Sequence, residues 1–242
     1  MDDVTAAKAI IACMDLTSLD DNDTEAKITK LCEKAKTYKV AAVCTHIKFI
    51  PLTKKLLKGT DIKIATVVNF PEGNADIHKT KMEIKEALRL GAEEIDAVFP
   101  YKNFINGDIQ TCEYFLNMVT DECKKATCKI ILETGELEKT SLIYGAAKLC
   151  IKHGVNFIKT STGKTKISAT PEAANAMLEA ISNSKGSIGF KASGGIKTID
   201  DAKKYLSLAQ IIMGTKWIKS QNFRIGASSL LDNLLQTIER GY

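Results

Sequence analysis

Two lysines that end short apolar segments are the residues best suited to covalent chemistry in this sequence. Lys159 closes the segment 156–159, and Lys191 closes the segment 188–191. Burying an ammonium group without a partner favours the neutral amine. If the two side chains face each other, the charge on one lowers the pKa of the other, as a lysine that forms a Schiff base requires. The alternative is that both amines reach solvent from strand ends or pair with carboxylates.

Asp96 is flanked by apolar residues, so the sequence predicts a buried carboxylate. A buried carboxylate needs a cationic partner or hydrogen bonds, and two inward lysines would supply the cation. Two interpretations stay open. One is an ion pair in the core with no catalytic role, and the other is a carboxylate that moves protons beside a reactive amine.

The elements that must position these residues are short apolar strands alternating with amphipathic helices. Strands are predicted over residues 10–14, 40–45, 63–69, 94–99, 129–133, 157–160, 187–191 and 210–213. Near-continuous apolar runs of this kind are typical of parallel strands buried on both faces. Eight strand–helix units in about 250 residues predict a TIM (β/α)8 barrel, here a single domain over residues 1–242. An open doubly wound sheet would usually carry a glycine-rich first turn, and the segment 14–18 has no glycine.

Helix boundary signals agree with this alternation. Thr170 is predicted to cap a helix whose first residue is Pro171, a residue favoured at that position. Thr198 is predicted to cap a helix with two aspartates in its first turn. Gly91 and Gly154 are placed to end helices. The last helix is predicted from one apolar face made of Ala227, Leu230, Leu231, Leu234, Leu235 and Ile238.

The composition excludes several classes of protein. The net charge of +5 is spread along the chain without a basic tail, which argues against a nucleic-acid partner. Seven cysteines, an odd number without C-x-x-C spacing, and the lack of a signal peptide predict reduced thiols in a cytoplasmic protein. Cys44 and His46 alone make a poor metal site. No apolar run is long enough to cross a membrane.

In a TIM barrel, polar residues at the carboxyl ends of strands line the active site. Besides the two lysines and Asp96, the predicted strand ends supply Asp15, Cys44, Thr45, Asn69, Glu133 and Thr134. A phosphate site is predicted beside them. Gly194-Gly195 follows the seventh strand, Gly226 to Ser229 open the last helix, and Lys164 follows Gly163. Glycines let backbone N–H groups approach an anion, and a helix N-terminus favours its charge.

From residue 15 to the C-terminus the chain resembles the 2-deoxyribose-5-phosphate aldolases. The resemblance lies in the segments 70–73 (FPEG), 94–101 (EIDAVFPY), 131–137 (ILETGEL), 157–163 (FIKTSTG), 189–195 (GFKASGG) and 223–229 (FRIGASS). It implies a class I aldolase without metal or organic cofactor. The implied reaction is reversible cleavage of 2-deoxy-D-ribose 5-phosphate to D-glyceraldehyde 3-phosphate and acetaldehyde, in deoxyribose phosphate catabolism.

The resemblance also implies residue roles. Lys159 is the Schiff-base lysine, Lys191 the cation that keeps it neutral, and Asp96 the general acid and base. The residues implied to hold the substrate or its phosphate are Thr162, Gly163, Lys164, Gly194, Gly195, Ser228 and Ser229. Asp15, Thr17, Cys44 and Asn69 are further candidates for the lining. The chain departs from the family pattern at Ala192-Ser193, where Pro-Ala is common, and at Lys197, where arginine is common.

Three alternatives and two open points follow. Another Schiff-base barrel could act on a different sugar phosphate or a ketose, and a barrel without catalysis could bind or sense a phosphosugar. A nucleic-acid module is the weakest alternative. Tyr242 ends a short tail, so a role for its hydroxyl in proton transfer is a hypothesis. Trp217 could contribute to a homodimer surface.

Overall fold

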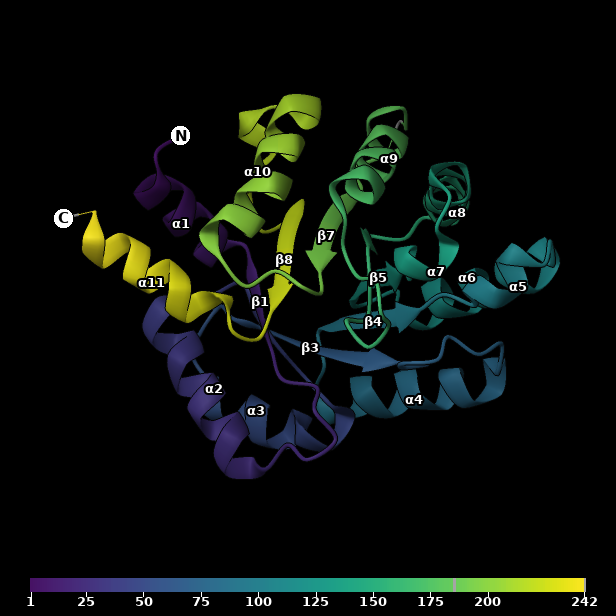
Figure 1. Cartoon of the computed structure of the whole chain (residues 1–242). Coiled ribbons are helices and arrows are strands. Elements are labelled where there is room, and N and C mark those ends of the chain that lie inside the picture. Colours follow the sequence, from purple (N-terminus) through teal and green to yellow (C-terminus); the bar gives the residue numbers. More distant parts are fainter. Residues whose placement is uncertain (185, 242) are drawn as a thin grey trace.

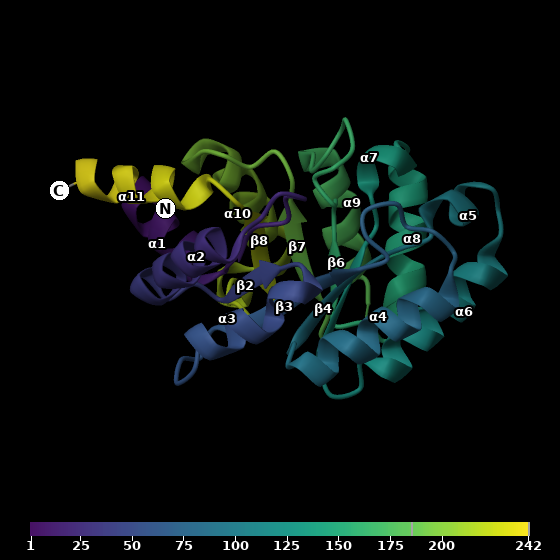
Figure 2. The same ribbon diagram turned by 90° about the horizontal axis from the view of Figure 1, so that it is seen from below.

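The structure, a computed structural model that describes residues 1–184 and 186–241, is a closed barrel of parallel strands surrounded by helices (Figures 1 and 2). Each strand pairs with its neighbours in sequence order, and β8 closes the barrel on β1. Within the described residues, the strands are β1 Met14–Thr17, β2 Ala42–Thr45, β3 Lys63–Val68, β4 Glu94–Val98, β5 Thr127–Ile131, β6 Phe157–Lys159, β7 Gly189–Ser193 and β8 Phe223–Ala227. The predicted TIM (β/α)8 barrel is confirmed.

Helices cover the outside of this barrel (Figure 2). The longer ones in the described ranges are α1 Asp3–Ala12, α2 Glu25–Tyr38, α4 Ile77–Leu90, α6 Ile109–Glu122, α8 Thr140–Lys152, α9 Pro171–Ser182, α10 Ile199–Met213 and α11 Leu230–Arg240. Shorter ones are α3 Ile50–Leu56, α5 Tyr101–Ile105 and α7 Thr134–Leu137, with 3-10 turns η1 Ile47–Phe49 and η2 Thr215–Trp217. No described helix is both long and apolar enough to span a bilayer.

The first predicted strand is wrong, because the segment 10–12 forms the last turn of α1. Asp2 caps this helix by accepting a hydrogen bond from the Thr5 N–H, and Ala6 and Ile10 share its buried face. A four-residue repeat of this kind is helical. The helix packs against α10 and α11, and β1 starts at Met14.

The eighth predicted strand is also wrong. The segment 210–213 is the last turn of α10, which continues the buried helical repeat of Ala202, Leu206 and Ala209. Ile211 is 80 % exposed, so its apolar side chain does not mark a core strand. The true β8 contains Arg224 between Phe223 and Ile225, and this charge hides its apolar character in the sequence.

The other strands are shifted from their predicted limits by two residues or fewer. In β5 the shift leaves Glu133 beyond the strand, in the left-handed conformation that starts α7. The predicted caps at Thr170, Thr198 and Gly91 are confirmed, and Gly154 follows the C-cap of α8. Ala227, predicted as part of the last helix, belongs to β8.

Most of the core lies between the strands and the helices, as in other α/β barrels. Trp217 is half-buried and packs against this core. A second, smaller apolar cluster centres on β2 and β3. Its members are Leu19, Ala42, Cys44, Ala65 and Val67, with Phe70 packed against them.

Candidate active site

Lys159, Lys191 and Asp96 meet inside the barrel. Lys159 ends β6, Lys191 lies in β7, and the two are direct partners in the register of these strands. The Asp96 Oδ2 atom lies 2.9 Å from the Lys159 Nζ atom and 2.7 Å from the Lys191 Nζ atom. None of the three is more than 4 % exposed. One carboxylate oxygen therefore bridges the two amines, which places all three groups within reach of a shared proton.

Asp15 extends this bridge toward β8. Its Oδ2 atom accepts a hydrogen bond of 2.5 Å from Lys191, and its Oδ1 atom accepts one of 2.5 Å from the Arg224 Nη1 atom. The Arg224 Nε atom donates to the carbonyl oxygen of Ser220. Gly226 lets the Lys191 stem lie against β8, because a Cβ atom there would be 3.0 Å from the Lys191 Cε atom.

Lys129 and Glu94 complete the buried cluster. Lys129 donates to Asp96 Oδ1 at 2.8 Å and to Glu94 Oε2 at 2.6 Å. Two guanidinium nitrogens of Arg224 contact Glu94, at 2.9 and 3.2 Å. A continuous path of ion pairs thus runs from Lys159 through Asp96, Lys129 and Glu94 to Arg224.

The charges of this cluster are divided between the two halves of the barrel. The carboxylates, Asp15, Glu94 and Asp96, come from β1 and β4. The cations, Lys129, Lys159, Lys191 and Arg224, come from β5, β6, β7 and β8. The cluster of described residues therefore has one more cation than carboxylates, and it is neutral when one lysine gives up its proton.

Lys159 is the lysine that the surroundings favour as the neutral amine. Burial lowers its pKa below the usual value, and the charge of Lys191 lowers it further, while Asp96 opposes both. Lys191 is equally buried, but Asp15 and Asp96 together overcome the cost of burial and raise its pKa. Lys159 has one carboxylate within ion-pair distance and Lys191 has two. This difference in partners separates the two amines.

Asp96 and Asp15 stay ionised. Burial alone would raise the pKa of Asp96, but Lys129, Lys159 and Lys191 outweigh it and hold that pKa well below the usual range. Asp15 behaves in the same way, because Lys191 and Arg224 lower its pKa more than burial raises it. The Lys191 ammonium therefore lies next to Lys159, with the ionised Asp96 carboxylate between the two amines.

A cavity of about 270 Å³ opens above Lys159 at the carboxyl ends of the strands. Its lining is rich in glycine and hydroxyl side chains and includes two further lysines. The members predicted from the sequence are Thr17, Lys159, Thr162, Gly163, Lys164, Gly194, Gly195, Ser228 and Ser229. Lys197 lines it as well. Lys164 lies 3.8 Å from Asp20 at the cavity, with a 35 % exposed side chain, so it stays available to a ligand.

Two loops line this cavity with glycine and serine, one at Gly194-Gly195 and the other at Ser228-Ser229. Gly194 and Gly195 both have positive φ, and a Cβ atom on Gly194 would lie 2.6 Å from the Ser168 side chain. The helix α11 begins after Ser229 without a side-chain hydrogen bond to its first turn. The free N–H groups of a helix start bind anions, so this end of the cavity suits a phosphate.

Three predicted lining residues lie elsewhere. Asp15 is fully buried in the charged cluster below the cavity. Cys44 is also fully buried, and burial raises the pKa of its thiol to about 11. Asn69 has a left-handed backbone, and its side chain donates to the carbonyl oxygens of Asn74 and Val98. Asn69 therefore shapes a loop and does not line the cavity, contrary to the prediction.

Sequence analysis missed Glu94, Lys129 and Arg224 as members of the cluster. Glu94 could have been found, because residues two apart on a strand point to the same face and Asp96 points inward. Lys129 is the register partner of Asp96 across β4 and β5, which only the structure shows. Arg224 was hidden because its strand was placed elsewhere.

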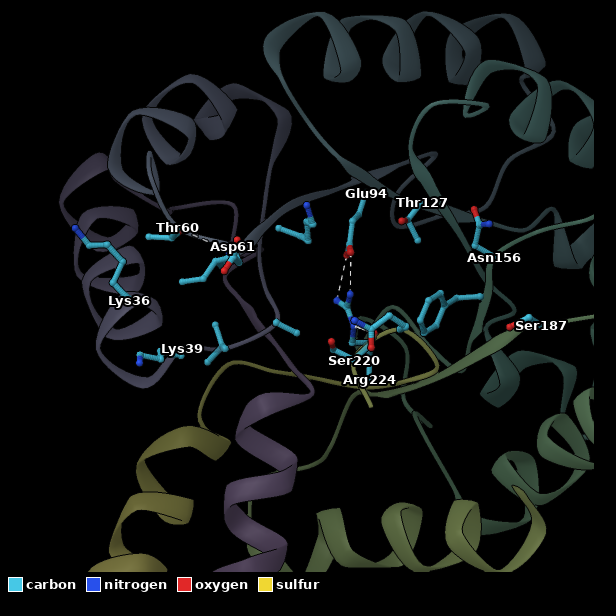
Figure 3. Close-up of a pocket in the computed structure, with 16 residues that line it drawn as sticks. Lys36, Lys39, Thr60, Asp61, Glu94, Thr127, Asn156, Ser187, Ser220 and Arg224 are labelled. Carbon is cyan, nitrogen blue, oxygen red and sulfur yellow. Dashed lines mark hydrogen bonds and ion pairs between the residues drawn. The ribbon is translucent and has the colours of Figure 1, made fainter. Parts of the chain in front are cut away.

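A second cavity, of about 830 Å³, lies at the opposite end of the barrel. The residues before or at the starts of β2 to β6 line it, together with Ser220 and Arg224. Figure 3 shows the Glu94 and Arg224 side chains pointing toward each other in this cavity. Its inner wall is therefore the far end of the ion-pair path that starts at Lys159.

Two further predictions concern the C-terminal residue and a metal site. Tyr242 lies outside the described residues. In the described part of the chain, His, Cys, Asp and Glu side chains form no group of three or more that could hold a metal ion.

Known proteins resemble this chain in sequence and in fold. The family model of the DeoC/LacD family aldolases matches residues 9–236. A crystal structure of a suspected deoxyribose-phosphate aldolase from Coccidioides immitis has a TM-score of 0.86 and 28 % identity, covering 96 % of this chain and 86 % of that one. The aldolase QR15 has a TM-score of 0.82 and 27 % identity, covering 96 % and 97 %.

A deoxyribose phosphate aldolase from Aeropyrum pernix shares the fold, with a TM-score of 0.73 at 20 % identity over 100 % of this chain and 98 % of that one. The family match spans nearly the whole barrel, including every strand that supplies a charge to the buried cluster. The chain therefore belongs to the DeoC/LacD family of aldolases.

Proposed function

We propose that the protein cleaves 2-deoxy-D-ribose 5-phosphate reversibly to D-glyceraldehyde 3-phosphate and acetaldehyde through a Schiff base on Lys159. One observation carries the proposal. Lys159 is a buried lysine with a lowered pKa and a single carboxylate in ion-pair distance, and it lies at the floor of a cavity suited to a phosphate. Class I aldol chemistry needs such a neutral amine.

The first step is attack of the Lys159 amine on the substrate aldehyde carbon. The hydroxyl of the resulting carbinolamine must leave as water, which requires a proton. The Lys191 ammonium supplies this proton through the Asp96 Oδ2 atom, which contacts both amines. The product is a protonated imine on Lys159, and Lys191 is left neutral until a proton returns.

The second step breaks the bond between C2 and C3 of the sugar. The C3 hydroxyl loses its proton to the relay, C3 becomes the aldehyde of glyceraldehyde 3-phosphate, and the bonding electrons pass to the imine. This gives an enamine of acetaldehyde on Lys159. Protonation of its carbon and addition of water then release acetaldehyde and restore the amine.

The surroundings of Lys159 support this chemistry. Leu19 lines the cavity and belongs to the apolar cluster of β2 and β3, together with Cys44 and Val67. An apolar wall limits the access of water to the enamine. On the other side, Lys164, Lys197 and the start of α11 suit the phosphate. The proposed setting is cytoplasmic catabolism of deoxyribose phosphate.

Reductive trapping tests the proposal. The protein is incubated with 2-deoxy-D-ribose 5-phosphate, reduced with borohydride, and the modified peptide is identified by mass spectrometry. The expected result is an adduct on Lys159 in the wild type and in Lys166→Ala, whose lysine is exposed in the same loop. Lys159→Ala should carry no adduct.

Other outcomes would point elsewhere. An adduct on Lys191 would exchange the roles of the two lysines. Trapping with fructose phosphates but not with deoxyribose 5-phosphate would indicate a different aldolase. Binding of deoxyribose 5-phosphate by the folded protein without any adduct would indicate a phosphosugar-binding protein.

A further inference from the structure

The connection between β6 and α9 carries Thr162, Gly163 and Lys164 to the cavity but has no regular secondary structure. It spans residues 160–170, and much of it is exposed. A loop of this length would cost much conformational entropy to order on ligand binding. Something must therefore hold it in place if the cavity is to exist before the substrate arrives.

Glu133 is the residue that fastens this loop. The Thr162 Oγ1 atom donates to Glu133 Oε2 at 2.5 Å, and the Thr162 N–H lies 3.2 and 3.3 Å from the two carboxylate oxygens. The Thr165 hydroxyl contacts Oε1 at 3.3 Å. Thr162 Oγ1 in turn accepts the N–H of Lys164 at 3.0 Å. One carboxylate thus contacts both ends of the segment 162–165, where the Thr165 hydroxyl also lies 3.0 Å from the Ile167 carbonyl oxygen.

Three features show that Glu133 is not an ordinary surface carboxylate. It is fully buried, and the loop groups that contact its carboxylate are neutral rather than cationic. Its backbone has a φ of 54°, a left-handed conformation that non-glycine residues adopt rarely. Such outliers persist only where the surrounding structure imposes them, and they gather at functional sites.

The loop also fits between two glycines. A Cβ atom on Gly135 would lie 2.0 Å from the Ile167 carbonyl oxygen, and one on Gly194 would lie 2.6 Å from Ser168. Gly135 follows Glu133 by two residues, so the same short segment both binds the loop and leaves room for it. Glu133 is not among the described residues that line the cavity.

We propose that Glu133 is a positioning residue that holds the Thr162–Lys164 segment in its phosphate-binding arrangement and thereby selects substrates with a terminal phosphate. The inference rests on the proposed function and extends it to specificity. Glu133 acts through Thr162 and does not touch the reacting atoms. Its two oxygens accept from several donors at once, which a glutamine amide cannot do because its NH₂ group would face another donor.

The test compares two substrates and one ligand in Glu133→Ala, Glu133→Gln and the wild type. The exposed carboxylate in Glu136→Gln is the matched control. Values of kcat/KM are measured with 2-deoxyribose 5-phosphate and with unphosphorylated 2-deoxyribose, and the Kd of inorganic phosphate is measured by calorimetry. Melting temperatures are recorded in parallel.

Glu133→Ala should lower kcat/KM for the phosphorylated substrate by about tenfold or more, mainly through KM, as expected for losing hydrogen bonds to a charged group. The same change should weaken phosphate binding by a similar factor and leave kcat/KM for 2-deoxyribose close to the wild-type value. Glu133→Gln should give values of kcat/KM and phosphate affinity between those of Glu133→Ala and the wild type. Glu136→Gln should match the wild type.

Equal losses on both substrates would overturn the inference, because they would place Glu133 in the chemistry or in general stability. Unchanged phosphate affinity in Glu133→Ala would overturn it as well. The phosphate measurement does not depend on turnover. If the wild type binds phosphate but cleaves no deoxyribose 5-phosphate, the proposed function fails, while the loss of phosphate affinity still decides the role of Glu133.

Discussion

The two ends of the barrel hold cavities that differ in size and in how fully their charged side chains are paired. The cavity of about 830 Å³ at the starts of the strands is walled by Arg224 and Glu94, which satisfy each other. The cavity of about 270 Å³ at the other end is floored by Lys159, which has one carboxylate in reach. We therefore propose that the smaller cavity is the reactive one. A shortage of carboxylate partners, rather than space, marks the end where an amine can react.

The pKa directions express the same contrast. At the starts of the strands, Asp15 and Glu94 raise the pKa of Arg224 despite its burial. Lys129, between the two ends, also has a raised pKa, because Asp96 and Glu94 outweigh its burial. At the other end, burial outweighs the attraction of Asp96 and lowers the pKa of Lys159, unlike the pKa of the other described lysines of this cluster.

The largest expected effect is on stability, from Glu94→Gln at the paired end. The change removes the negative charge that pairs with Arg224 and Lys129 in the buried interior. Removing one partner of a buried ion pair costs about 3–5 kcal/mol, which urea unfolding would measure. Glu93→Gln, an exposed neighbour, is the control. A loss of stability no larger than in the control would mean that the cluster contributes little to folding.

A smaller effect is expected at the reactive end, on the pH dependence of imine formation in Lys191→Met. Lys159 must be neutral to attack, so the rate rises as pH passes upward through its pKa. The charge of Lys191 is one cause of the lowered pKa of Lys159, so its removal raises that pKa and moves the acidic limb to higher pH.

Cyanoborohydride trapping at a series of pH values measures this limb in the wild type and the variant. Lys197→Met, which removes a cation of the cavity outside the buried cluster, is the matched control. A limb that stays in place in Lys191→Met would show that burial alone sets the reactivity of Lys159.

The smallest effect is expected from Lys63→Ala, which removes a cation from the larger cavity. Its ion pair with Glu93 is about half exposed on both sides, and pairs of this kind contribute about 0–1 kcal/mol. Stability should change within that range, and turnover of deoxyribose 5-phosphate should not change. A large loss of turnover would mean that the larger cavity takes part in the reaction.

That three of the buried charged residues lie near one another could be expected from the sequence, because the pattern of residues at strand ends is local. Lys159, Lys191 and Asp96 each interrupt an apolar run, and a parallel barrel brings such positions together. Arg224 was missed because its charge made β8 look like a loop, while the apolar end of α10 looked like a strand.

The errors at Asn69 and Glu133 have another cause. Both residues stand just after a strand, where the sequence predicts side chains that face the cavity. Both adopt a left-handed backbone, which turns the chain. The Asn69 side chain then donates to the end of β4, and the Glu133 side chain accepts from the loop after β6. Glutamate gives no sign of this turn in advance and asparagine merely favours it, since the packing around each residue imposes it.

The division of the charged cluster between β1–β4 and β5–β8 has a consequence for folding. Either half alone would enclose charges of one sign, carboxylates in the first and cations in the second. Because neither half can bury its inner charges until the other arrives, we expect the two halves of the barrel to close cooperatively. Because the two halves carry opposite charges, we expect a first half to pair with a second half in preference to another copy of itself.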